Sequence, residues 1–160
     1  IPEEQVEPFN SALEMLDKSI SELRRVAHNL MPESLVRYGL NSAISDFCKG
    51  IDIAHYHFYG VEKRFQEKLE ITVFRIVNEL VNNALKHANA TAINIQLVQD
   101  ENRISVTVHD NGSGFDTNSV SPDKSSGLKN VKSRVVSYNG RLDILSTPNQ
   151  GTEVSVEFYC

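Results

Sequence analysis

The sequence predicts a two-layer α/β sandwich with an N-terminal helical extension. Short segments alternate apolar and polar residues as strands do, and helical patterns lie between some of them. A heptad pattern also fills the first thirty or so residues. Because strands outnumber helices and come largely in consecutive pairs, we expect one mixed, mainly antiparallel sheet with helices on one face.

Composition limits the class of protein. With 160 residues and 40% apolar side chains, the chain can form one ordinary core. The net charge is −5 and no stretch concentrates Lys and Arg, which argues against nucleic-acid binding. Cys48 and Cys160 lack the spacing of a zinc site and are expected to be packing or surface thiols in a reducing cytoplasm.

No apolar run approaches the roughly 18 residues of a membrane span, and the N-terminus has no features of a signal peptide. The sequence begins with Ile1 rather than Met. We therefore expect a cytoplasmic fragment, and any membrane anchor would lie outside it.

The first segment has apolar residues in a 3,4 repeat, the pattern of a helix packed lengthwise in a coiled coil or bundle. An amphipathic helix buried within the molecule is the alternative. The seam residues are Val6, Phe9, Leu13, Leu16, Ile20, Leu23, Ala27 and Leu30.

Pro32 is expected to end or kink this helix, since proline disfavours helical geometry in the residue before it. A second helical pattern then runs from Leu35 to about Gly50. We therefore predict a helical piece over residues 1–50 and the sandwich over residues 51–160.

The sandwich is expected to begin with a strand over 53–59 and a long helix over 68–88. Two strands over 93–98 and 104–108 form a hairpin signal. A polar Gly- and Ser-rich segment over 113–126 is predicted to be a mobile loop, followed by a helix over 128–138. Strands over 141–146 and 152–158 complete the sheet.

Three polar boxes lie along this domain. In the first, Glu79, Asn83 and either Lys86 or His87 recur at helical spacing and therefore share one stripe. An amide oxygen can serve as a protein ligand of Mg²⁺, so Asn83 is a candidate metal ligand, and Glu79 could act on an attacking nucleophile. A solvated helix face is the alternative, but several Asn residues inside one helix cost local stability.

The second box begins with Asp110, at the end of a strand, and continues through Gly112 and Gly114. Glycines let the backbone lie close to a ligand, and the carboxylate can accept a hydrogen bond from an amino group. A simple Asp-Asn-Gly turn is the alternative. Phe115 could belong to the core, anchor the loop or stack on a base.

The third box begins at Gly127 and Leu128, where a helix is expected to start. Free backbone N–H groups and the positive helix end suit an anion such as a phosphate. Ser125, Ser126 and Lys129 could add donors. A glycine before a helix cap is the common alternative.

The three boxes, with Gly151 and Thr152 opening the last strand, resemble the ATP-binding domain of sensor histidine kinases. That domain has the Bergerat fold and belongs to the GHKL ATPases, which include Hsp90-type chaperones, MutL-type repair proteins and type II topoisomerases. The third box, Gly-Leu-Lys-Asn-Val-Lys-Ser-Arg over 127–134, resembles that of the nitrate-sensor and desaturase-sensor subgroup. Val131 replaces its usual methionine.

The resemblance implies ATP and Mg²⁺ as cofactors. Asn83 would bind the metal, Glu79 would be the catalytic acidic residue, and Asp110 would read the adenine amino group with help from Thr152 through water. Residues 113–126 would form the lid over the nucleotide. The other residues expected to bind the nucleotide are Lys86, His87, Gly112, Gly114, Gly127 and Leu128.

The heptad helix resembles the second helix of the dimerisation hairpin and its connector. His28 is then not the phosphoacceptor, because it is followed by Asn29, whereas an acidic residue usually follows the acceptor in this subgroup. We expect the acceptor upstream of residue 1.

The implied function is the catalytic module of a two-component histidine kinase. It would transfer the γ-phosphoryl group of ATP to histidine for relay to the receiver domain of a response regulator, and would act as a homodimer through the hairpin. An anti-sigma-factor-type serine kinase is an alternative that would not need the heptad helix. A non-catalytic dimerisation or binding module would not need the polar boxes.

Overall fold

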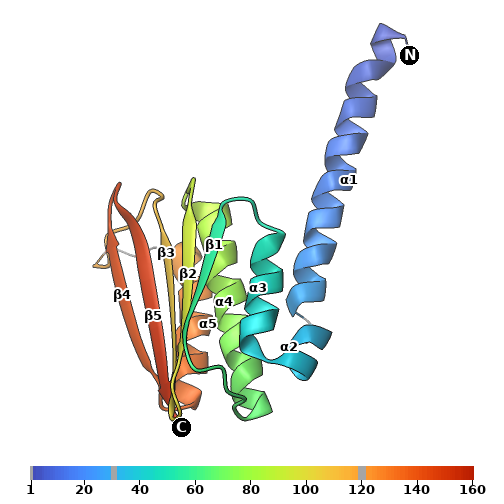
Figure 1. Ribbon diagram of the computed structural model, residues 1–160. Helices are drawn as coiled ribbons and strands as arrows, with labels where there is room; N and C mark the ends of the chain where they lie inside the picture. The colour runs from blue at the N-terminus through green and yellow to red at the C-terminus, as the bar shows by residue number, and fades with distance from the viewer. Residues whose placement is uncertain (1, 30–31, 119–121) are drawn as a thin grey trace. The chain divides into compact units, whose positions relative to one another are not determined.

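A computed structural model describes residues 2–29, 32–118 and 122–160. Within its helices, the side chains of residues 3, 4, 24, 25, 27–29 and 122–126 lie outside the description. The chain divides into two compact units, Ile1–Pro32 and Glu33–Cys160. Figure 1 shows the elements of both.

The second unit contains one mixed sheet in the order β1-β2-β3-β5-β4. Its strands are β1 (Ala54–Gly60), β2 (Ile93–Gln99), β3 (Arg103–Asp110), β4 (Arg141–Thr147) and β5 (Gly151–Tyr159). Only the β1 and β2 pair is parallel, and the other three pairs are antiparallel. The predicted mixed, mainly antiparallel sheet is confirmed.

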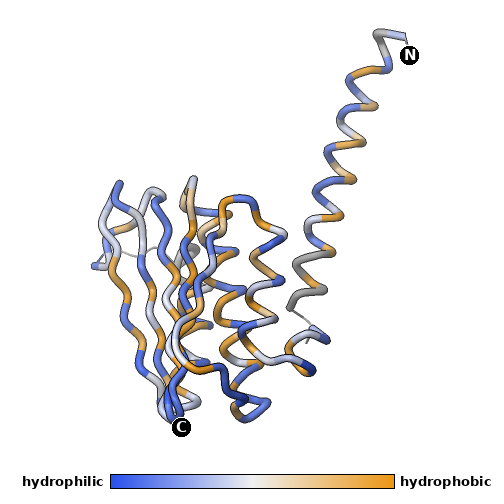
Figure 2. The backbone as a smooth tube through the Cα atoms, in the orientation of Figure 1, coloured by the Kyte–Doolittle hydropathy of each residue, from blue (hydrophilic) through white to orange (hydrophobic). Residues whose placement is uncertain are grey.

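Three helices cover one face of this sheet, namely α3 (Leu40–Lys49), α4 (Glu67–His87) and α5 (Pro122–Ser137). The inward side chains of the strands pack against them, because alternate residues of a strand point to opposite faces. The alternation of apolar and polar residues along the strands is visible in Figure 2. The largest fully buried side chains include Phe74, Ile95, Leu97, Ile104 and Phe158.

The other face of the sheet is polar. His55 and His57 are exposed on β1, and His109 is half-buried on β3. Between β3 and β5, the hydroxyl groups of Thr107 and Ser155 form a hydrogen bond of 3.0 Å on this face. A sheet with one buried and one open face is the two-layer arrangement expected from the sequence.

The predicted second helix is broken in two, which corrects the expectation of one helix to Gly50. Helix α2 (Glu33–Tyr38) ends before Gly39, whose φ of +90° suits glycine and cannot continue a helix, and α3 begins at Leu40. The apolar residues of both helices join the sheet core. The compact unit therefore starts at Glu33, earlier than the expected boundary at Gly50.

Arg64 fastens α2 to α4. Its guanidinium group donates to both carboxylate oxygens of Glu70 at 3.0–3.2 Å and to the backbone oxygens of Leu35, Val36 and Arg37 at 3.2–3.4 Å. The Glu70 side chain is 1% exposed, and Arg64 is its salt-bridge partner. The carbonyl groups at the end of α2 thus receive the donors that a helix C-terminus lacks.

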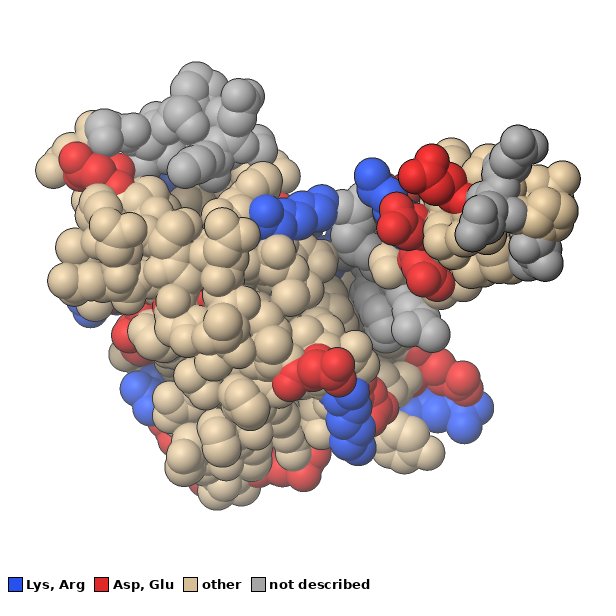
Figure 3. Space-filling view, turned by 90° about the horizontal axis from the view of Figure 1, so that it is seen from above, with Lys and Arg blue, Asp and Glu red and all other residues tan. Residues whose placement is uncertain are grey.

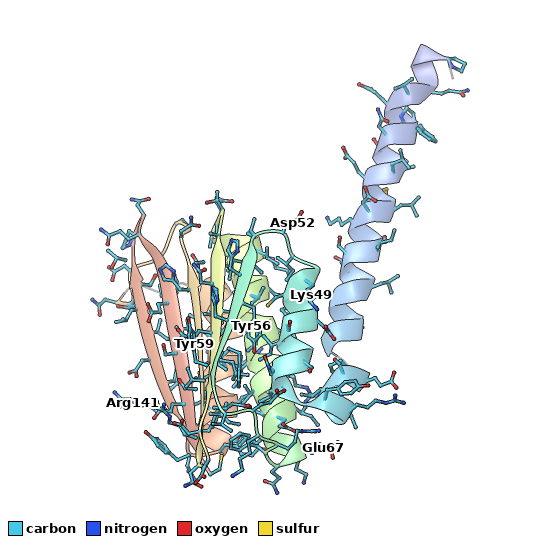
Figure 4. The ribbon with its side chains drawn as sticks, in the orientation of Figure 1. Lys49, Asp52, Tyr56, Tyr59, Glu67 and Arg141 are labelled. Atoms are coloured by element: carbon cyan, nitrogen blue, oxygen red, sulfur yellow. The ribbon has the colours of Figure 1, made fainter. Side chains whose placement is uncertain are left out.

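A second polar contact joins α3 to β1. The hydroxyl of Tyr56, which Figure 4 labels on β1, donates to Asn41 Oδ1 at 2.8 Å. Cys48, also on α3, is buried, and this burial raises the pKa of its thiol to about 12. Cys160 is exposed at the C-terminus.

The first unit contains helix α1 (Glu3–Asn29). The side chains of its predicted seam that the structure describes are exposed by 40–68%, namely Val6, Phe9, Leu13, Leu16, Ile20 and Leu23. The described seam is therefore an open apolar stripe. Ala27 and Leu30 of the predicted seam lie outside the described side chains.

Helix α5 begins at Pro122, so the predicted loop over 113–126 is wrong for its last five residues. Leu85, an apolar residue of α4, is 43% exposed. On the face of the second unit that Figure 3 shows, Lys and Arg side chains stand singly or beside acidic ones. Among the described residues, no helix is sufficiently long and apolar to cross a bilayer.

Candidate functional site

A pocket opens between α4, the ends of β3 and β5, and the start of α5. Its walls are largely apolar, and a carboxylate, an amide and a hydroxyl are the main polar groups along them. The lining residues are Leu80, Asn83, Ala84, His87, Ala88, Val108, Asp110, Ser113, Gly114, Phe115, Leu128, Thr152 and Val154. A mainly apolar cavity with a few convergent polar groups is the usual form of a small-molecule site.

Asp110 and Thr152 lie side by side at one end of the pocket because they are register partners in the pairing of β3 with β5. Asp110 is only 6% exposed. Its Oδ1 accepts a hydrogen bond of 2.9 Å from the backbone N–H of Gly112. Among the described residues, Oδ2 has no hydrogen-bonding partner, so it is free to accept from a ligand.

The turn after Asp110 is held rigidly against the end of α4. Asn111 Oδ1 accepts from the backbone N–H groups of Thr91 and Ala92 at 2.9 and 3.0 Å, and its Nδ2 donates to Thr91 Oγ1 at 2.8 Å. The Ser113 N–H donates to the Ala88 oxygen at 2.6 Å. These bonds fix the Asp110 carboxylate relative to α4.

The polar stripe of α4 faces the same region, but its members differ in position. Asn83 and His87 line the pocket, while Glu79 and Lys86 are not among its described lining residues. Glu79 and Asn83 are half-buried, and Lys86 and His87 are exposed. The sequence did not decide whether Lys86 or His87 completes the stripe, and of these two residues it is His87 that lines the pocket.

Gly127 lies inside α5 rather than before it, which corrects the expectation of free N–H groups at that point. Its backbone comes close to both polar side chains of α4. A Cβ atom added there would lie 2.5 Å from Asn83 Nδ2 and 2.7 Å from Glu79 Oε1. Only glycine permits this approach without displacing Asn83 and Glu79.

These residues fit a flat, apolar ring that carries an amino group. Val108 and Val154 supply apolar walls, and the free oxygen of Asp110 supplies an acceptor. Asn83, which also lines the pocket and lies beside Gly127, offers an amide oxygen of the kind that Mg²⁺ accepts. The donor set therefore suits a purine nucleotide with a divalent cation.

Comparison with known families agrees with this geometry. Residues 68–159 match the family described as histidine kinase-, DNA gyrase B-, and HSP90-like ATPase. The chain belongs to this ATPase family. The matched range includes α4, the whole pocket, α5 and β5, so the polar boxes lie within an ATP-binding domain.

Curated relatives of this ATPase domain are named as histidine kinases. The signal transduction histidine-protein kinase/phosphatase DegS of Brevibacillus brevis is 31% identical over 96% of this chain and 41% of its own length. The oxygen sensor histidine kinase NreB of Staphylococcus carnosus is 32% identical over 89% of this chain and 43% of its length. The chain thus spans less than half the length of these relatives.

Solved structures show the same fold. The blue-light activated histidine kinase of Erythrobacter litoralis EL346 aligns with a TM-score of 0.59 at 19% identity, covering 74% of this chain and 41% of its own. The histidine kinase AdeS of Acinetobacter baumannii aligns with a TM-score of 0.55 at 14% identity, covering 99% and 85%. The predicted ATPase fold is confirmed.

The ATPase pocket also contains residues that the sequence did not single out. Val154, Ala84 and Ala88 look like ordinary core residues in the sequence, and nothing there marks them as pocket walls. Asn111 does not line the pocket among the described residues but holds the turn after Asp110, and it could have been noticed, since Asn often bonds to nearby backbone in turns. Ser125 and Ser126, the predicted phosphate donors, lie outside the described side chains, and Lys129 is exposed on α5.

Proposed function

We propose that this chain is the catalytic module of a two-component sensor histidine kinase. It binds Mg-ATP and transfers the γ-phosphoryl group to a histidine, for later relay to the receiver domain of a response regulator. The observation that carries the proposal is the nearly buried Asp110 carboxylate, with one free oxygen, at the end of an apolar pocket in an ATPase domain.

The adenine is proposed to enter the apolar pocket with its amino group toward Asp110 and Thr152. A buried acceptor discriminates strongly against a base that lacks the matching donor, because the acceptor then stays unpaired. Phe115 and Leu128 lie along the same pocket and would cover the ring.

Asn83 is proposed to hold the Mg²⁺ ion, together with phosphate oxygens and waters. The bound ion would neutralise charge on the phosphates. Lys86, His87 and the backbone near Gly112 and Gly114 would bind the rest of the nucleotide, and Gly127 would let α5 lie close to Asn83 and Glu79. Glu79 would orient the acceptor imidazole or take its proton, since it lies on the same helix face one turn before Asn83.

We also propose that α1 is the second helix of a dimerisation hairpin and that residues 33–50 connect it to the ATPase domain. Its exposed apolar stripe supports this role, because such stripes are covered in a stable assembly. We propose that His28 is not the phosphoacceptor histidine. The structure does not describe the His28 side chain, so this proposal rests on the sequence, in which Asn29 follows His28.

The nucleotide site is tested by isothermal titration calorimetry with Mg-ATP. Asp110→Ala should weaken ATP binding by about 1–3 kcal/mol, since it removes the acceptor for the amino group. Asp143→Ala is the control, because Asp143 is an exposed carboxylate that pairs with Arg141 on β4. Equal ATP affinity in the Asp110→Ala variant and the parent chain would contradict the proposed site.

Phosphotransfer is tested with radiolabelled ATP and a longer version of the chain that supplies the upstream helix as acceptor. We expect acid-labile phosphate on the longer chain and none on this one. Label that appears on this chain and disappears in His28→Gln would show that His28 is the acceptor.

A further inference from the structure

We infer that Ser146 is a positioning residue that orients the hydroxyl of Thr152 and thereby sets which purine the pocket prefers. Ser146 lies near the end of β4 and is not among the described residues that line the pocket. The inference rests on the proposed nucleotide-binding function, because it concerns the base that enters that pocket.

The Ser146 hydroxyl connects three parts of the site. Its Oγ lies 2.9 Å from the backbone N of Phe115, 2.8 Å from Thr152 Oγ1 and 3.3 Å from the backbone oxygen of Gly151. Phe115 and Thr152 both line the pocket. One side chain that does not line the pocket therefore contacts two residues that do, Phe115 and Thr152.

Only one placement of the hydroxyl protons allows all three contacts of Ser146 to be hydrogen bonds. A hydroxyl has one proton to donate and two lone pairs to accept with. The Phe115 N–H can only donate, so it occupies one lone pair. The Gly151 oxygen can only accept, so it takes the single Ser146 proton. Thr152 must then donate its own proton to the remaining lone pair of Ser146.

This arrangement makes Thr152 an acceptor toward the pocket, because its only proton points back at Ser146. Asp110, its register partner on β3, also presents an acceptor there. The part of the pocket at Asp110 and Thr152 then presents hydrogen-bond acceptors to the base. It favours a purine with an amino group at ring position 6 and repels one with a carbonyl oxygen there.

Loss of the Ser146 hydroxyl would release the Thr152 proton. Thr152 could then rotate and donate into the pocket, which would let it pair with a carbonyl oxygen. The tether to Phe115 would be lost as well, but that loss would weaken every purine nucleotide alike. The ratio of affinities for two purines therefore reports on the polarity of Thr152 and is insensitive to a general loosening of the site.

The experiment compares the binding of ATP and inosine triphosphate, each with Mg²⁺, by calorimetry. Inosine triphosphate has a carbonyl in place of the amino group at position 6. In the parent chain we expect a clear preference for ATP. In Ser146→Ala the ratio of the two affinities should fall by about tenfold, the effect of one well-placed hydrogen bond.

Three further comparisons separate a positioning role of Ser146 from a structural one. Ser155→Ala removes a similar Ser–Thr hydroxyl bond, to Thr107 on the open face of the sheet, and should leave the ratio unchanged. Ser146→Thr keeps the hydroxyl and should retain the preference of the parent chain for ATP. In a Thr152→Val background, Ser146→Ala should have no further effect on the ratio, because the hydroxyl that it orients is gone.

An unchanged ratio in a folded Ser146→Ala variant would overturn the inference while leaving the nucleotide site intact. The same holds for an equal fall of the ratio in Ser155→Ala. If Ser146→Ala does not fold, Ser146→Cys takes its place, because a thiol is only a weak donor and acceptor, and it should lower the ratio in the same direction. Binding of neither nucleotide by the parent chain would instead contradict the proposed function itself.

Discussion

At the scale of single residues, the proposed site assigns separate roles to neighbouring side chains. Asn83 lines the pocket, whereas Glu79 lies one turn earlier, half-buried beside Gly127. The sequence indicated both through their helical spacing, because that spacing fixes which side chains share a stripe. It could not indicate Ser146, since the neighbours of a hydroxyl depend on how β4 and β5 pair.

The first prediction at this scale separates binding from transfer. Asn83→Ala should abolish the enhancement of ATP binding by Mg²⁺, because it removes the proposed ligand of the ion. Glu79→Gln should leave ATP affinity within about threefold and slow phosphoryl transfer, by about a hundredfold or more if Glu79 acts on the proton. Calorimetry with and without Mg²⁺ measures the first effect, and the radiolabel assay on the longer chain, which supplies the phosphoacceptor, measures the second. Persisting Mg²⁺ enhancement in Asn83→Ala would assign the ion to another residue.

The second prediction concerns the two thiols. Burial raises the pKa of Cys48 to about 12, so almost none of it is thiolate at pH 8. A disulfide reagent at that pH should label only Cys160 rapidly in the native chain, and Cys48 only after denaturation. Because the folded pKa lies above the unfolded one, the contribution of Cys48 to stability should decline from about pH 9 toward pH 12. Equal labelling rates for the two thiols at pH 8 would contradict this burial.

At the scale of elements, the joint between α2 and α4 is the feature least visible in the sequence. Arg64 and Glu70 lie in a charged stretch that reads as an ordinary linker and helix start. Folding buries the Glu70 side chain almost completely and leaves Arg64 as its salt-bridge partner. Removing one partner of such a pair is costly, because the other charge stays buried and unpaired.

Arg64→Met should therefore lower the free energy of unfolding by about 2 kcal/mol, allowing for the half-exposed Arg64 side chain. Arg103→Met is the matched control, since it breaks a surface pair with Asp100, and should cost less than about 1 kcal/mol. The double variant Arg64→Met with Glu70→Met should recover part of the loss. Urea denaturation measures all three. Equal losses of unfolding free energy for Arg64→Met and Arg103→Met would show that leaving the Glu70 carboxylate unpaired costs no more than breaking a surface pair.

At the scale of the whole molecule, the sequence predicted the layers and the order of the elements, and strong alternation and helical periodicity made this possible. The roles of the three boxes stay predictions. The compact unit begins at Glu33, whereas the ATPase domain was predicted from residue 51, because helices α2 and α3 have amphipathic patterns that suit either a bundle or a sheet cover. The start of α5 was also missed, since a Ser- and Asp-rich stretch has low local helix preference.

The last prediction follows from the observed boundary. A chain of residues 33–160 should fold and melt cooperatively, whereas a chain of residues 51–160 should not, because it loses Leu35, Leu40, Ile44 and Phe47 from the core. Each such deletion costs about 2–5 kcal/mol, so together they approach the whole stability of a domain. Thermal unfolding followed by circular dichroism measures this. Similar melting of both chains would place the boundary near Gly50 after all.

The parallel pairing of β1 with β2 has a mechanical consequence for the proposed nucleotide site. Helix α4 is the connection between these two neighbouring strands, so the wall that carries Asn83 and Glu79 is anchored at both ends to one edge of the sheet. Helix α5 is joined to β3 through the longer polar segment that begins at Asn111. The side of the proposed site formed by α4 is thus tied to the sheet at both ends by chain connectivity, and any nucleotide bound there meets a wall whose position the sheet sets.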